Sequence, residues 1–138
     1  MSERPDAVEQ ALRALRHRDR STAELDARLA RRGVSDPERE QALETLARIG
    51  YLDDERVART RAEQLAARGS GDALIRHDLE GRGIAADQVA AVLAELEPEP
   101  TRAARIVTRR GRSVKTARYL TSRGFGEDAL ALVVAQED

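Results

Sequence analysis

The chain carries the segment Leu29-Ala30-Arg31-Arg32-Gly33-Val34, and two later segments share its pattern: Leu79-Glu80-Gly81-Arg82-Gly83-Ile84 and Leu120-Thr121-Ser122-Arg123-Gly124-Phe125. In each segment a leucine precedes a glycine by four residues, and an apolar residue follows that glycine. A glycine just past the end of a helix can adopt the left-handed conformation that folds backbone amides onto the last carbonyls. The pattern therefore predicts three helix ends, each followed by an apolar anchor.

The three glycines lie 50 and then 41 residues apart, so the pattern is a tandem repeat whose third copy is the shortest. Repeats of this length are supersecondary units that bury their apolar faces against their neighbours. We therefore predict an all-α fold of three tandem three-helix repeats. The expected repeats span residues 6–50, 53–97 and 101–136.

Start signals for the helices support this division. The expected first residues or caps are Asp6, Ser21 and Asp36-Pro37 in the first repeat, Asp53 or Asp54, Gly71-Asp72 and Asp87 in the second, and Thr101, Ser113 and Glu127 in the third. Short polar side chains in these positions accept hydrogen bonds from the free amides of a first helical turn. The prolines of Glu97-Pro98-Glu99-Pro100 are interpreted as a stiff linker before the third repeat.

Apolar positions coincide when the three repeats are superposed. The equivalent sets are Leu25, Ile75 and Thr116; Leu29, Leu79 and Leu120; and Leu43, Leu93 and Val134. Thr116 is the polar exception, and we expect its neighbour Ala117 to occupy the packing position. The core is expected to consist of aliphatic side chains, because the chain has only three aromatic residues.

Composition excludes several classes of protein. The chain has no cysteine, which excludes disulfides, thiolate metal sites and a cysteine nucleophile. It shows neither the apolar core of a signal peptide nor an apolar run long enough to span a membrane. We expect a cytoplasmic protein.

Sequence motifs of catalysis are absent as well. The only lysine, Lys115, lies outside any phosphate-binding loop pattern, and His17 and His77 have no metal-ligand spacing. The acidic run Asp53-Asp54-Glu55 is interpreted as the first turn of a helix, where the macrodipole favours carboxylates, rather than as a metal site. The sequence thus predicts a protein that is not an enzyme and that has no catalytic residue, cofactor or metal.

Charge is distributed unevenly along the chain. Residues 1–54 and 55–100 carry net charges of −2 and −3, whereas residues 101–138 carry +4. No carboxylate lies between Pro100 and Gly126, and eight cationic residues do: Arg102, Arg105, Arg109, Arg110, Arg112, Lys115, Arg118 and Arg123. A solvated helix face usually mixes both signs of charge. We therefore predict that these residues bind an anionic partner, either DNA phosphates or an acidic protein surface.

One block of sequence resembles a known family. Ile49-Gly50-Tyr51-Leu52-Asp53-Asp54-Glu55-Arg56-Val57-Ala58, set between the Ser21–Gly33 and Gly71–Ile84 patterns, is similar to the RecX family of bacterial recombinase regulators. The resemblance extends over about residues 7–135, with Val57 standing where the family commonly has phenylalanine. It implies an elongated, curved array of three-helix repeats.

The resemblance also implies a function. It points to a regulator, expected to be monomeric, that binds the RecA recombinase filament on DNA and mainly inhibits its growth, ATP hydrolysis and strand exchange. This would place the protein in recombination, DNA repair and the SOS response, with DNA phosphates as a further contact of the third repeat.

An alternative interpretation is a DNA-binding helix-turn-helix within the third repeat. Residues 113–124 and 127–136 would supply its two helices, joined by a short glycine turn. Against this interpretation, the second helix begins with acidic residues and has no arginine, asparagine or lysine to contact base edges.

Overall fold

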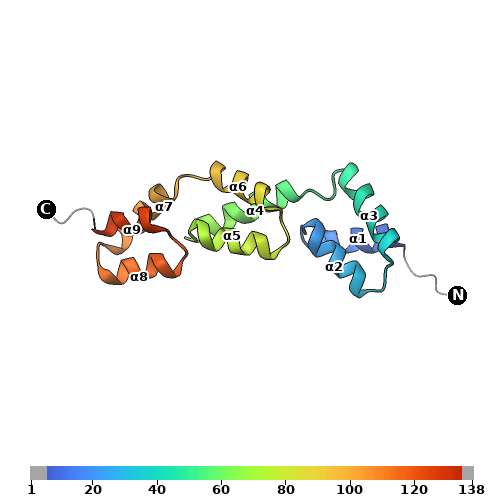
Figure 1. Cartoon of the computed structure of the whole chain (residues 1–138), viewed down its shortest axis with the longest axis horizontal. Coiled ribbons are helices and arrows are strands. Elements are labelled where there is room, and N and C mark those ends of the chain that lie inside the picture. The colour runs from blue at the N-terminus through green and yellow to red at the C-terminus, as the bar shows by residue number, and fades with distance from the viewer. Residues whose placement is uncertain (1–5, 135–138) are drawn as a thin grey trace. The chain divides into compact units, whose positions relative to one another are not determined.

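The computed structural model describes residues 6–134, and every regular element within them is a helix (Figure 1). The helices are α1 (Ala7–His17), α2 (Thr22–Arg31), α3 (Asp36–Arg48), α4 (Asp54–Ala67), α5 (Asp72–Gly81), α6 (Ala86–Glu95), α7 (Glu99–Arg110), α8 (Val114–Ser122) and α9 (Glu127–Val134). The prediction of an all-helical fold is confirmed.

The repeated glycines end helices as predicted. Gly33, Gly83 and Gly124 follow α2, α5 and α8 and have φ angles of +84°, +78° and +84°. After α2, the Val34 amide donates back to the Leu29 carbonyl at 3.1 Å, and after α8 the Phe125 amide donates to Leu120 at 3.0 Å. The apolar residue after each glycine is buried, so each helix end is also a packing point.

The helix starts follow the predicted signals with three corrections. Helix α6 begins at Ala86, after Ala85, which has no capping side chain, so Asp87 lies within the first turn rather than at the start or the cap. Ser21 caps α2 in a complete capping box with Glu24, as its sequence indicates. The cap of α3 is Ser35, which accepts from the Glu38 amide, so Asp36 is the first helical residue rather than the cap. Helix α7 begins at Glu99 rather than at Thr101, because Pro100 fits the first helical turn, where a proline loses no hydrogen bond. Glu99 and Pro100 therefore belong to the helix and not to the predicted linker.

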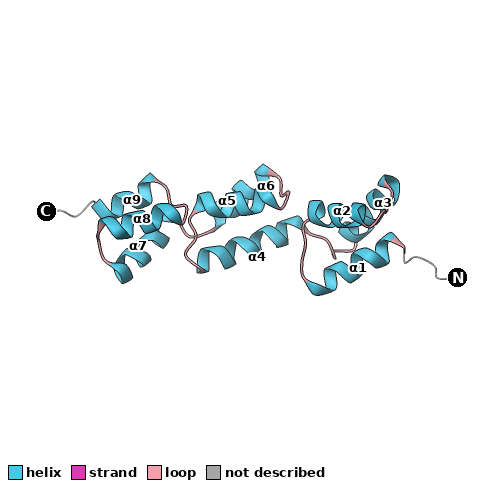
Figure 2. Ribbon diagram, turned by 90° about the horizontal axis from the view of Figure 1, so that it is seen from below, coloured by secondary structure: helices cyan, strands magenta, loops and turns pink. Residues whose placement is uncertain are grey.

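The superposed leucines form the centres of the repeats. Leu25, Leu29, Ile75, Leu79 and Leu120 are fully buried. Helices α1, α2 and α3 pack on one another, as do α7, α8 and α9, and α5 packs on α6 with α4 alongside (Figures 1 and 2). Of the third predicted set, Leu93 is buried and Leu43 packs at the edge of its core. The side chain of Val134 lies outside the described residues, as do the last two residues of the predicted third repeat.

Thr116 itself occupies the packing position, so the expectation for Ala117 is wrong. Thr116 is 2% exposed, whereas Ala117 is only half-buried. The Thr116 hydroxyl shares a hydrogen bond with the Ser113 hydroxyl at 3.2 Å. A buried hydroxyl with a partner avoids the cost of an unsatisfied polar group, and the threonine methyl remains available for packing.

The chain forms two compact units. One runs to Val57 and includes Arg82–Ile84; the other contains Ala58–Gly81 and the described residues from Ala85 onward. In the first unit, the Ser21 hydroxyl donates to the Arg82 carbonyl, and the Arg82 guanidinium lies 3.3 Å from a Glu24 carboxylate oxygen. The turn at Arg82 therefore packs on the start of α2.

Within the second unit, the start of α5 meets the turn after α8. The Gly71 amide donates to the Arg123 carbonyl at 2.7 Å, and the Ala73 amide donates to the Gly124 carbonyl at 3.2 Å. Glu99, at the start of α7, accepts from the amides of Asp72 and Gly126, both at 2.7 Å. These contacts fix α7 and α8, which carry the predicted basic residues, against the second repeat.

Candidate partner-binding surface

The eight cations predicted to bind a partner lie on α7, on α8 and in the turns that follow these helices, and the structure divides them into two groups. Three are engaged by other parts of the second unit: Arg102, Arg105 and Arg123. The other five are exposed: Arg109, Arg110, Arg112, Lys115 and Arg118. We call these five residues the basic cluster.

Arg102 does not lie on the exposed face where it was predicted. Its side chain is 8% exposed and forms an ion pair with the Asp72 carboxylate. It also donates to the carbonyls of Ser70, at 2.9 Å, and Glu97, at 3.0 Å. A buried guanidinium with three acceptors holds α7 against the start of α5, so Arg102 has a structural role rather than a partner-binding one.

Arg105 and Arg123 are also engaged, although less deeply. Arg105 is paired in bidentate fashion with Glu97, at 2.7 Å for its longer contact. The hydrogen bond from Arg105 holds the pKa of Glu97 below its usual range, and the same bond raises the pKa of Arg105. The Arg123 guanidinium donates to the Arg68 carbonyl at 3.3 Å and to the Ser70 hydroxyl at 3.2 Å.

Four members of the basic cluster differ from these three arginines, because no carboxylate in the described part of the chain pairs with Arg109, Arg110, Lys115 or Arg118. Arg109, Lys115 and Arg118 form no hydrogen bond or ion pair with any residue in the range 6–134. The Arg110 guanidinium lies over the Tyr119 ring, 3.5 Å from its centroid, an arrangement that orients the cation while leaving its charge in place. These four side chains therefore present positive charge to solvent.

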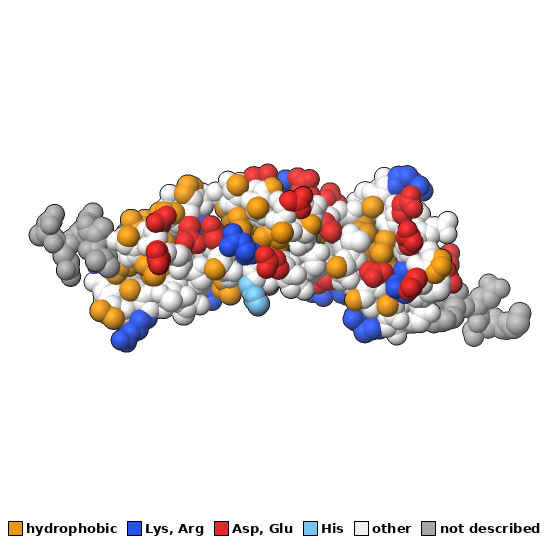
Figure 3. All heavy atoms as spheres, viewed as in Figure 1, with side chains coloured by type: hydrophobic (Ala, Val, Ile, Leu, Met, Phe, Trp, Pro, Cys, Tyr) orange, Lys and Arg blue, Asp and Glu red, His pale blue; other side chains and the backbone are white. Residues whose placement is uncertain are grey.

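The two helices place this charge around one turn. Arg109 and Arg110 lie in the last turn of α7, and Lys115 lies in the first turn of α8, which contains no acidic residue. The positive end of the α8 dipole adds to the field of these cations. Figure 3 shows Lys or Arg side chains projecting beside α8 at the lower left, with Asp and Glu side chains gathered elsewhere on this face.

A groove borders the cluster within the second unit. It has a volume of about 470 Å³, and its apolar lining includes Ala66, Leu96, Ile106 and Phe125. Its charged lining comes from glutamates of α4, α6 and the segment after α6 and from arginines of α7: Glu63, Glu95, Glu97, Arg102, Arg105 and Arg109. The mixed charge of this groove contrasts with the single sign of the basic cluster.

The sequence analysis predicted neither the groove nor the junction between the start of α5 and the turn after α8. One signal was present: Gly71 stands where the other repeats have a serine that caps the second helix. A glycine has no capping side chain, so the α5 amides need acceptors from elsewhere. Glu99 and the carbonyls after α8 supply them.

Other functional arrangements receive no support from the described residues. Between residues 6 and 134, no three His, Asp or Glu side chains come together as metal ligands would. The same range contains no helix with the length and apolarity needed to cross a bilayer. In α9, the would-be recognition helix of a helix-turn-helix, the first turn contains Glu127 and Asp128 and the described residues include no cation.

Sequence comparison identifies the relatives. A protein named regulatory protein RecX, from Halorhodospira halophila, is 32% identical over 138 residues, covering 93% of this chain and 86% of the relative. The chain belongs to the RecX family. The family model described as RecX, first three-helix domain, matches residues 7–46. The family resemblance of the sequence is thereby confirmed.

Two further RecX relatives show how the similarity is spread. The regulatory protein RecX of Syntrophotalea carbinolica is 44% identical over 90 residues, which are 62% of this chain and 59% of that protein. The protein of the same name from Mycobacterium leprae is 32% identical over 150 residues, covering 96% of this chain and 88% of the relative. The similarity to regulatory proteins therefore extends over nearly the whole chain and supports a regulatory role.

Solved RecX structures share the fold. The crystal structure of RecX from Lactobacillus salivarius matches with a TM-score of 0.80 at 16% identity, covering 94% of this chain and 93% of that one. A second crystal structure of a regulatory protein RecX matches with a TM-score of 0.77 at 17% identity, covering 94% and 72%. At these identities the match concerns the fold of the RecX chain.

Proposed function

We propose that this protein binds the RecA recombinase filament on DNA and modulates it, mainly by inhibiting filament growth, ATP hydrolysis and strand exchange. Membership of the RecX family of regulatory proteins supports a regulatory role for the protein. The main observation in favour of the proposed contact is the basic cluster. Its five exposed cations lie on and around the turn between α7 and α8, in a segment without a carboxylate.

The cluster suits an anionic surface of the filament, either acidic protein side chains or DNA phosphates. Exposed charges of this kind act mainly on the association rate and on its salt dependence. Arg102, Arg105 and Arg123 are not included in the proposed contact, because each already donates a hydrogen bond to another residue of the second unit.

The test is a double charge reversal, Arg109→Glu with Arg118→Glu, measured as inhibition of RecA ATP hydrolysis on single-stranded DNA. We expect the apparent affinity to fall by about tenfold at low salt, equivalent to about 1.4 kcal/mol, with a smaller effect at raised salt. The matched control is Arg13→Glu with Arg16→Glu, which reverses two exposed charges on α1.

The outcomes separate the levels of the proposal. Unchanged RecA turnover with saturating wild-type protein would overturn the proposed function itself. Inhibition by the α7–α8 variant equal to that by wild type, with the same salt dependence, would overturn the role of the basic cluster only. Equal loss in both double variants would show a response to net charge rather than to this surface.

A further inference from the structure

The turn between α3 and α4 exposes two large apolar side chains. Ile49 is 53% exposed and Tyr51 is 58% exposed, and they flank Gly50. Among the described residues only Val114 is a comparably exposed large apolar residue, and it lies on α8. Single exposed apolar residues are common on protein surfaces, but two on one short turn form a local apolar projection.

The backbone of this turn is held firmly. Gly50 has a φ of +85°, and the amides of Tyr51 and Leu52 both donate to the Leu46 carbonyl, at 3.0 and 3.2 Å. Leu52 is 4% exposed and anchors the turn in the core of the first unit.

A second set of hydrogen bonds comes from Arg56. Its guanidinium donates to the Gly50 carbonyl at 3.2 Å and to the Tyr51 carbonyl at 3.4 Å. The same guanidinium donates two further bonds, at 3.0 and 3.1 Å, to the Asp19 carboxylate, and this hydrogen bonding to Asp19 raises the pKa of Arg56. The polar groups therefore fix the turn while leaving its two apolar side chains uncovered.

A rigid turn with exposed apolar side chains is suited to binding a protein. Preorganisation lowers the entropy lost on association, because the backbone is already ordered. Tyrosine offers a large contact area with few rotatable bonds, and it is enriched among the residues that dominate protein interfaces. Ile49 adds aliphatic surface beside it.

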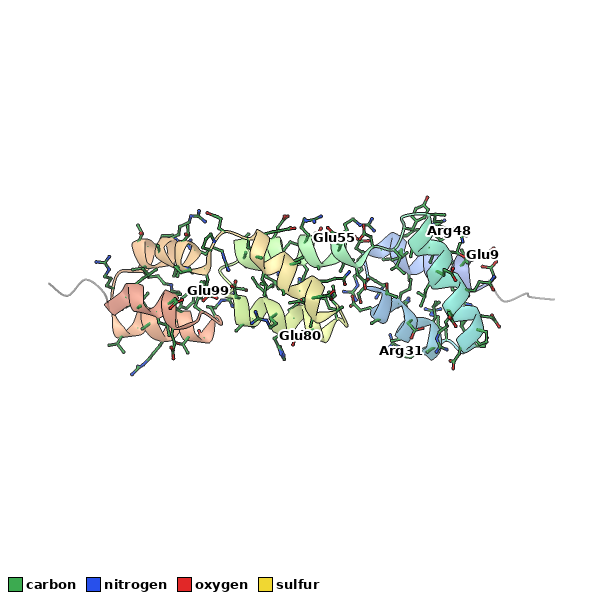
Figure 4. All side chains as sticks on the ribbon, turned by 45° about the horizontal axis from the view of Figure 1, so that its top comes forward. Glu9, Arg31, Arg48, Glu55, Glu80 and Glu99 are labelled. Carbon is green, nitrogen blue, oxygen red and sulfur yellow. The ribbon has the colours of Figure 1, made fainter. Side chains whose placement is uncertain are left out.

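Charge around the turn favours a protein over a nucleic acid. Asp53 and Glu55 are exposed directly after it, whereas Arg48 precedes it, and Figure 4 labels Arg48 and Glu55 at the surface. Carboxylates beside Tyr51 repel phosphates, and one aromatic ring beside an aliphatic side chain is a poor platform for stacked bases. A fitting partner surface has an apolar recess with cations at the edge that meets Asp53.

We propose that Ile49 and Tyr51 form an anchor that enters an apolar recess on the protein surface of the recombinase filament. This inference rests on the proposed function and adds a second contact, of different chemistry, to that of the basic cluster. The anchor contributes apolar contact with a slow dissociation rate, whereas the cluster contributes attraction that salt weakens.

The experiment measures the double variant Ile49→Ser with Tyr51→Ser, and Tyr51→Phe is the matched control. Binding is measured by fluorescence anisotropy of the full chain, labelled at its N-terminal amine, on RecA filaments assembled on single-stranded DNA with a non-hydrolysable ATP analogue. A parallel titration uses the same DNA without RecA. Circular dichroism melting checks that each variant is folded.

We expect the double variant to bind filaments at least about tenfold more weakly, the size of effect found for interface anchors. Tyr51→Phe should bind within about twofold of wild type, because it keeps the aromatic ring. If the double variant melts below the assay temperature, the single variant Tyr51→Ser, at a mostly exposed position, takes its place.

Four results would overturn the anchor. Filament binding by the double variant equal to that of wild type refutes it while leaving the proposed function intact, whereas a wild-type chain that does not bind filaments at all removes the function and the anchor together. Loss of binding to naked DNA in parallel with filament binding would mean that Tyr51 contacts bases. A wild-type dimer that the double variant dissociates would mean that the turn joins two copies of the chain.

Discussion

Gly71 and Gly124 lie so close together that a β-carbon built on Gly71 would be 2.5 Å from the carbonyl carbon of Gly124. The reverse approach is also tight, since a β-carbon on Gly124 would lie 2.7 Å from the Leu74 amide nitrogen. The start of α5 and the turn after α8 therefore meet backbone against backbone, and glycine is required there for space as well as for helix termination.

Replacing Gly71 by alanine should destabilise the protein by about 1–3 kcal/mol, because the added methyl group meets backbone atoms that cannot rotate away. Gly81→Ala is the control, since its β-carbon would meet nothing within 4 Å and alanine favours a helix. Denaturant unfolding measures both. Equal free energies of unfolding for wild type and Gly71→Ala would show that the junction yields easily.

Replacing Arg102 by methionine should cost about 1–3 kcal/mol, because the Asp72 carboxylate and two carbonyls lose a charged donor at a mostly buried site. Arg109→Met, at an exposed position, should change the free energy of unfolding by less than about 0.5 kcal/mol. Urea unfolding distinguishes them. If both variants were as stable as wild type, Arg102 would not hold α7 in place.

Leu79→Ala should lower the free energy of unfolding by about 2–5 kcal/mol, since Leu79 is fully buried and its truncation leaves a cavity. Val114→Ala provides the comparison, because Val114 is 69% exposed and contributes little packing. Thermal and chemical unfolding check the difference. A Leu79→Ala protein as stable as the Val114→Ala protein would contradict the burial of the repeated leucines.

Arg105→Gln should raise the pKa of Glu97 toward the ordinary glutamate value, because the hydrogen bond from Arg105 is the main cause of its depression. A carboxyl with a pKa lower in the folded than in the unfolded state stabilises the fold above its unfolded pKa, and that stabilisation disappears as the pH falls through the folded pKa. NMR titration of the Glu97 side chain measures the shift, with Arg109→Gln as control. A titration curve unchanged by Arg105→Gln would show that the pair does not persist in solution.

The repeat architecture was predictable because helix ends and buried leucines are local signals. The Arg-Gly-apolar segment marks the end of a helix, and the leucine four residues before its glycine marks the buried face of that helix, as at Leu29 and Leu120. Thr116 was misjudged because the hydrogen bond that makes its burial possible joins two hydroxyl groups, a detail that an apolar pattern does not register.

The candidate surface was predictable only in part, because a sequence shows charges and not their partners. The ion pair between Arg102 and Asp72 joins residues 30 positions apart, and Arg123 reaches Ser70 across 53 positions. The sequence shows the eight cations and the segment without carboxylates that contains them. It does not show which of these cations contact the second repeat, because that depends on how the second and third repeats meet.

The carboxylate of Glu99 accepts from the Asp72 amide, the first of α5, and from the Gly126 amide just before α9. In arrays of repeats, cooperativity depends on the strength of the interface between neighbours, and weakly joined repeats melt one at a time. One side chain that completes the start of two helices in different repeats links their melting. We therefore expect the second and third repeats to unfold in a single step.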